Sequence, residues 1–228
     1  MNLDRTLEFL TALEANNSFE WMKEHKKDYQ IAKNEFLKFV QELLLLIAEF
    51  DPPIGNLEPK RLVYRLNRDI RFSHDKTPYH PAFRAHLSIA ERKPIPAGYY
   101  ICIKPGQSFL GGGVFATQFS QATELIREHL ISHPEEFQQI ITKKAFVETF
   151  KVEGLKLKNV PRGYDKDHPL AEYLKHKSWN IEYKISDQEL LTEASEYVVE
   201  KFKLMLPLNG FLNQGLVDFR MPERRKYL

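Results

Sequence analysis

The chain of 228 residues contains a single cysteine, Cys102. One thiol excludes an intrachain disulfide and a zinc site built from several cysteines. The most apolar segment, residues 43–48, is far too short to cross a bilayer. The amino terminus also lacks the basic region and apolar stretch of a secretory signal peptide. We therefore expect a cytoplasmic protein without a membrane partner.

The sequence also lacks a strong charge of either sign. Lys and Arg number 33 against 31 for Asp and Glu, so the formal net charge is +2. Proteins that bind polyanions in bulk usually carry a larger excess, so nucleic-acid binding would depend on a local patch. A hydrophobic fraction of 43% is ample for a core. We expect a single α+β domain over residues 1–212, followed by a basic tail over residues 213–228.

Helical periodicity dominates the first fifty residues and the second half of the chain. One short helix is followed by a cap at Ser18. The helical pattern that begins there reaches residue 50, and because this is long for one helix we expect a break near residues 28–33. Capping boxes are predicted at 132–135, with Pro134 in the first turn, and at 186–189. The helix expected after the second box has a continuous apolar stripe, formed by Leu190, Ala194, Tyr197, Val198 and Phe202.

Apolar and polar residues alternate in the middle of the chain, which predicts β-strands. The expected strands cover residues 62–72, 83–89 and 99–104, with a fourth that ends in the glycines at 111–113. Short consecutive strands favour an antiparallel meander over about residues 61–115, within an antiparallel or mixed sheet flanked by helices. In that arrangement the polar face of the first strand would lie beside Arg84 and His86.

The segment from Arg65 to Tyr79 has an unusual density of charge. Arg65 and Arg71 flank Asp69 on one predicted face, where Asp69 would orient two guanidinium forks toward a phosphate or carboxylate. We predict a pocket for a small anionic ligand, lined by Arg65, Arg68, Asp69, Arg71, Lys76 and Tyr79. The alternative is a salt-bridge network that only stabilises the fold or serves a protein partner.

Catalysis at this place is left open. Its candidate acids and bases are His80, His86 and Asp69. Cys102 has no nearby base in the sequence and is expected to be structural, and the glycine-rich segment 106–113 lacks the lysine of a phosphate loop. Histidines recur at six-residue intervals, a spacing that suits neither a strand nor a helical metal site, so we expect no metal there.

A second class of function uses the same basic face to bind nucleic acid. Tyr79, Tyr99 and Tyr100 would stack on bases, and binding would weaken steeply with salt. The near-neutral total charge counts against this hypothesis. The basic tail, with Arg220, Arg224, Arg225 and Lys226, is expected to be a solvated terminus, with docking of a partner as the alternative.

Residues 65–79 also carry a motif of the form Arg-x-x-Arg-Asp-x-Arg-Phe, followed by Asp-Lys and Tyr. With Asn16–Asn17, Trp21, His25–Lys26 and Tyr29, this motif resembles the bacterial family known as domain of unknown function 2461. Other segments also fit, at 98–100, at 111–113 with Arg127, at 161–164 and at 168–169, whereas 115–117 departs from the pattern. The resemblance implies a compact intracellular α+β protein of this length, and it implies no particular activity or cofactor.

Overall fold

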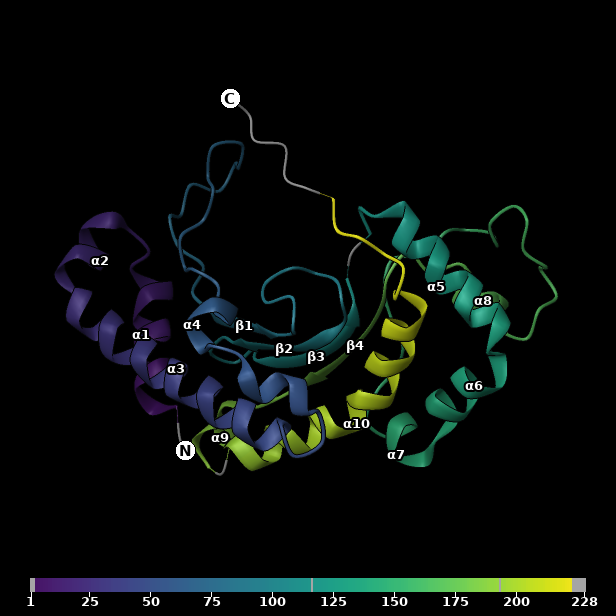
Figure 1. Ribbon diagram of the computed structural model, residues 1–228. Helices are drawn as coiled ribbons and strands as arrows, with labels where there is room; N and C mark the ends of the chain where they lie inside the picture. Colours follow the sequence, from purple (N-terminus) through teal and green to yellow (C-terminus); the bar gives the residue numbers. More distant parts are fainter. Residues whose placement is uncertain (1–2, 116, 193, 223–228) are drawn as a thin grey trace. The chain divides into compact units, whose positions relative to one another are not determined.

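The protein is an α+β structure, as the computed structural model in Figure 1 shows for residues 3–115, 117–192 and 194–222. Its antiparallel sheet has the strand order β1 (Phe83–Leu87), β2 (Gly98–Ile103), β3 (Phe109–Val114) and β4 (Trp179–Lys184). The predicted fold class and the consecutive order of β1 to β3 are confirmed. None of the helices in the described part of the chain is both long and apolar enough to cross a bilayer.

The chain divides into two compact units. The first comprises Met1–Arg92, Tyr99–Gly111 and Glu182–Leu204, and the second comprises Lys93–Gly98, Gly112–Ile181 and Met205–Leu228. Helices of the first unit are α1 (Asp4–Ala15), α2 (Phe19–Glu24), α3 (Lys26–Ile47), α4 (Pro59–Leu62), α9 (Asp187–Leu191) and the beginning of α10 (Ala194–Gly215), with a 3₁₀ turn η1 (Pro52–Asn56). The second unit contains α5 (Ser120–Ser132), α6 (Pro134–Thr142), α7 (Lys144–Val147) and α8 (Ala171–Leu174).

The core of the first unit lies between α3 and one face of the sheet. Phe36 of α3 is fully buried, and its ring stacks on Phe83 of β1 with centroids 5.3 Å apart. The ring of Tyr99 of β2 packs at a tilt against that of Phe202 of α10, with centroids 5.1 Å apart. Because side chains alternate along a strand, Arg84 and His86 extend from the opposite face of β1. Arg84 therefore lies on the face of β1 away from these helices.

Several predicted helix boundaries are correct. The Ser18 hydroxyl accepts a hydrogen bond from the Trp21 amide at the start of α2. Both halves of the capping box at 186–189 are present, and Pro134 occupies the first position of α6. The predicted tail begins inside a helix, because α10 continues to Gly215, and residues 223–228 of that tail lie outside the described part.

Three helix predictions are wrong. α3 is continuous across residues 28–33, and the break lies at His25, whose ring stacks on Trp21 with centroids 4.1 Å apart. No side chain caps α6, so the box at 132–135 is not formed. The expected helix after residue 186 is two helices, α9 and α10, although Leu190, Val198 and Phe202 of its stripe are all buried.

The predicted strand at 62–72 is also wrong. Its residues form only two isolated bridges, Val63 with Ala85 and Asn67 with Tyr79, and residues 69–77 form a loop. The loop is turned by aspartate side chains that bond to the backbone two residues ahead: Asp69 accepts from the Arg71 amide and Asp75 from the Thr77 amide. Such local bonds compete with the ladder of a sheet.

Candidate functional site

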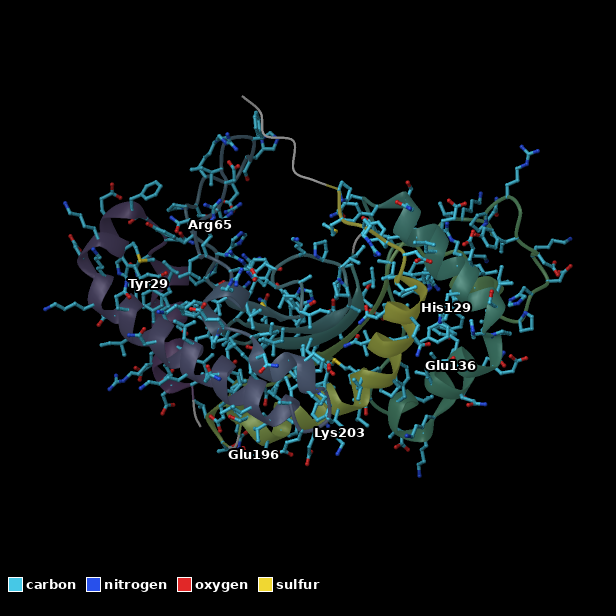
Figure 2. The ribbon with its side chains drawn as sticks, in the orientation of Figure 1. Tyr29, Arg65, His129, Glu136, Glu196 and Lys203 are labelled. Carbon is cyan, nitrogen blue, oxygen red and sulfur yellow. The ribbon has the colours of Figure 1, made fainter. Side chains whose placement is uncertain are left out.

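Residues 63–80 form a hairpin-like excursion beside β1, which we name the arginine hairpin. Its two arms are joined by backbone hydrogen bonds from the Arg68 amide to the Pro78 carbonyl, at 2.9 Å, and from the His80 amide to the Leu66 carbonyl, at 2.8 Å. Figure 1 shows the loop extending from the region of α4 and β1, and Figure 2 labels Arg65 near its base. These bonds hold the two arms of the hairpin side by side.

Arg68 holds the loop of the arginine hairpin together. Its side chain is only 18% exposed, and the guanidinium donates to the Asp75 carboxylate, to the Thr77 hydroxyl and, at 3.2 Å, to the Thr77 carbonyl. Hydrogen bonds from Thr77 and Arg68 lower the pKa of Asp75 to about 2. The guanidinium of Arg68 is thus largely occupied by its own loop.

Arg71 and Asp69 form a two-pronged ion pair at the exposed tip. Arg71 Nε and Nη2 donate to the two oxygens of Asp69 at 2.9 and 2.6 Å. Hydrogen bonds from Arg71 lower the pKa of Asp69 to about 2, with a smaller contribution from the charge of Arg65. Lys76 donates to the Ile70 carbonyl at 3.1 Å. Arg65 is exposed and makes no ion pair within the described ranges.

A second charged group lies where the arginine hairpin meets the sheet. Arg84 of β1 is the cross-strand neighbour of Cys102, and its guanidinium lies 5.5 Å from the centroid of the Tyr64 ring. Its Nε is buried without a hydrogen-bond partner, and Arg84 has no carboxylate partner among the residues that the structure describes. The charges of Arg84 and Arg68 both reach His80 and lower its pKa, after the larger effect of burial.

The groups around Arg84 are mostly neutral at pH 7. Burial raises the pKa of Tyr64 and brings that of Tyr100 to about 12, so both hydroxyls keep their protons. Burial also raises the pKa of Cys102 to about 11, so the thiol stays protonated at neutral pH. His80 is neutral for the reasons given above. Arg84 is therefore surrounded by neutral hydrogen-bonding groups, with the cations Arg68 and Arg92 near the same residues, an arrangement suited to binding an anion.

One of the predicted pocket residues, Tyr79, lines a cavity in the described part of the chain. Tyr79 is 8% exposed and contributes to a pocket of about 260 Å³ between α2, α3 and the hairpin arms, which Arg65, Arg71 and Lys76 do not line. His86 is buried on β1 as the cross-strand partner of Tyr100. In the described ranges, no three His, Cys, Asp or Glu side chains are placed to hold a metal ion.

Tyr99 is buried, and its ring is not accessible for the base stacking that the nucleic-acid hypothesis requires. It is 1% exposed, its ring packs on Phe202, and its hydroxyl donates to Asp51 at 2.9 Å. Sequence reasoning placed Arg84 beside the arginine segment but gave it no role. The alternation of residues 83–89 was a sufficient signal that Arg84 leaves the apolar face.

Comparison with known proteins adds one finding. A family model described as "Conserved hypothetical protein (DUF2461)" matches residues 5–211, most of the chain. No curated protein and no solved structure matches this chain. The resemblance indicated by the arginine motif is confirmed.

Proposed function

We propose that this chain, which belongs to the DUF2461 family of conserved hypothetical proteins, binds a small phosphate- or carboxylate-bearing ligand at Arg84. The observation that carries the proposal is the buried Nε of Arg84, which has no hydrogen-bond partner. A buried donor left without a partner costs about 1–3 kcal/mol. An anionic oxygen at this position would satisfy the donor and neutralise the guanidinium.

The surroundings of Arg84 support an anion more than a cation or a neutral ligand. The charges of Arg84 and Arg68 both act on His80 and, with burial, favour its neutral form, and Tyr64 provides a ring under the Arg84 guanidinium. The arginines of the hairpin differ, since Arg68 and Arg71 already donate to Asp75 and Asp69. An anion at those positions would first have to displace a carboxylate, whereas the Arg84 side chain is hydrogen-bonded to the neutral Tyr100 hydroxyl and keeps an unpartnered Nε.

Catalysis is not part of this proposal. Asp69 has a pKa of about 2 and is a weak base, and it is held by Arg71 at the loop tip. Cys102 stays protonated beside Arg84. A general base needs a pKa near the working pH. Two of the predicted candidates lie near Arg84: the partly exposed His80, and His86, which is buried on the same face of β1.

The test is a thermal-shift screen of wild type, Arg84→Gln and Arg65→Gln with phosphate, sugar phosphates, dicarboxylates, nucleotides and short single-stranded DNA at two salt concentrations. Arg65 is the matched control, because it is an arginine of the same region that lies exposed at the base of the hairpin. A ligand at about 100 times its Kd stabilises by about 2.7 kcal/mol. We expect one anion class to stabilise wild type and Arg65→Gln, and to bind Arg84→Gln at least about tenfold more weakly.

The same screen separates the alternatives. Equal binding by wild type and Arg84→Gln would refute the proposal, and loss only in Arg65→Gln would place the anion in the hairpin as the sequence predicted. One observation favours the nucleic-acid alternative: Phe72 at the loop tip is 95% exposed, with the Arg71 guanidinium 5.9 Å from its ring centroid. That alternative predicts a shift with DNA alone, erased by salt and by Phe72→Ala.

A further inference from the structure

The pocket beside Tyr79 lies apart from Arg84 and has a different lining. It is bounded by α2, the first turns of α3 and the hairpin arms at Leu66–Asn67 and Tyr79, and its volume is about 260 Å³. We infer that it is a binding site for a small aromatic anion, a single ring bearing a carboxylate or phosphate. This site is distinct from the one proposed at Arg84 and does not depend on it.

The wall of the pocket is fixed by contacts between distant parts of the sequence. The Asn17 side chain donates to the Tyr79 carbonyl at 2.9 Å and accepts from the Tyr79 amide at 3.1 Å. Asn67 forms a bridge with Tyr79 from the other hairpin arm. Tyr79 is therefore held from both sides, and a preformed wall lowers the entropy cost of binding a ligand.

Aromatic rings make up much of the lining. The rings of Phe19 and Tyr79 meet edge to face with centroids 5.8 Å apart, and Tyr29 of α3 lines the same space. Met22 adds a flexible thioether, which adapts to flat apolar ligands. Phe19 is 58% exposed although it borders the pocket, so a ring inserted here would cover apolar surface that water now contacts.

The polar part of the lining selects an anion. Lys23 and Lys26 border the pocket, and no carboxylate is among its lining residues. Neither lysine forms an ion pair or a side-chain hydrogen bond with any other described residue. Glu20 is the acid whose charge reaches Tyr79, but it lies outside the lining. Two unpaired ammonium groups at the mouth of an aromatic pocket match a ring that carries a negative group.

The volume limits the ligand. Pockets for drug-sized molecules measure roughly 300–1,000 Å³, so about 260 Å³ suits a smaller molecule. Amide groups at Gln30 and Asn67 provide donors and acceptors for one ring substituent. Benzoate and phenyl phosphate are therefore suitable probes, with acetate and inorganic phosphate as matched anions without a ring.

The experiment uses the methyl signals of the four methionines, labelled with ¹³C in the full chain. Met22 lines the pocket and Met205 is buried in α10, so the second serves as an internal control. We expect benzoate or phenyl phosphate to shift the Met22 signal, assigned with Met22→Leu, and to leave Met205 unchanged. Acetate and phosphate are expected to leave both unchanged. Absence of any Met22 shift at millimolar probe would overturn the inference.

The contribution of the two lysine charges to binding is tested with neutralising substitutions at exposed positions. Lys23→Met with Lys26→Met is expected to weaken binding by about tenfold, whereas Lys27→Met, an exposed neighbour on α3 outside the lining, is expected to bind as wild type. Equal binding by the double variant and wild type would refute the role of the lysines. Arg84→Gln is expected to retain the Met22 shift, and its loss there would refute a separate site.

Discussion

Asn17 connects the amino-terminal helices to the arginine hairpin, and its replacement by alanine gives a direct measure of that connection. The side chain makes two hydrogen bonds with the backbone of Tyr79, at 2.9 and 3.1 Å. Each is worth about 1 kcal/mol, and the partly buried amide and carbonyl left behind raise the cost. We expect Asn17→Ala to lower the free energy of unfolding by about 2–4 kcal/mol, or the Tm by at least about 4 °C.

The assay is urea unfolding followed by Trp fluorescence and circular dichroism, with Asn16→Ala as the matched control. Asn16 is exposed and its side chain makes one bond, to the Ala12 carbonyl at 2.9 Å, so its loss is expected to cost less than about 1 kcal/mol. If Asn17→Ala and Asn16→Ala unfold at the same urea concentration, the connection to Tyr79 does not stabilise the hairpin and the reasoning fails.

Asn17→Asp extends this test to pH. The new carboxylate keeps the acceptor for the Tyr79 amide but places a negative oxygen against the Tyr79 carbonyl. This repulsion would raise the pKa of the aspartate above its unfolded value of about 3.9. The variant is then expected to regain stability as the pH falls below the raised pKa, and to lose it as the pH rises through it. A loss of stability that does not change with pH would contradict the assignment of the Asn17 side-chain amide as the donor to the Tyr79 carbonyl.

Three further predictions concern other parts of the chain. By carbon NMR, the pKa of Asp69 is expected to be about 2, and Arg71→Gln is expected to return it toward about 3.9. The ion pair then stabilises the fold at neutral pH, and this contribution is lost as the pH falls from about 3.9 to about 2. A wild-type pKa near about 3.9 would contradict the ion pair. Gly113→Ala is expected to destabilise by more than about 3 kcal/mol in urea unfolding, because φ is +91° and the new Cβ would lie 2.1 Å from the Trp179 carbonyl oxygen. Cys102 is expected to react with a thiol reagent only as the protein unfolds, since it is buried and its pKa is about 11; rapid labelling of the native protein would refute this.

The parts of the fold that sequence reasoning identified are those in which local patterns and packing agree. Phe83, Ala85 and Leu87 alternate with polar residues and are buried against helices, so β1 was predictable. β4 was not predicted, because Trp179–Lys184 pairs with β3 across a long separation in sequence that leaves no local sign. Strand pairing of this kind depends on tertiary contacts more than on residue preference.

In the candidate site, too, local sequence patterns predicted some features, whereas others depend on tertiary contacts. The charge density of residues 65–79 coincides with the arginine hairpin, but alternation alone could not show that Asp75 and Thr77 would bond back to Arg68. The pocket beside Tyr79 was not predictable, because it forms only when Asn17 and Tyr79, far apart in the chain, come together. The sequence provided the groups, and tertiary contacts determine which of them remain available.

The arginines in and near the hairpin differ in how far their guanidinium groups are already hydrogen-bonded within the protein. Arg68 is mostly covered and bonded to its own loop, so its removal should act on the fold before it acts on any ligand. Arg71 is exposed and paired with Asp69, a kind of pair that contributes little to stability in water. Arg84 differs from both, because burial removes its Nε from water and no protein group replaces that water. A binding function that uses this region should therefore depend more on Arg84 than on the arginines of the motif.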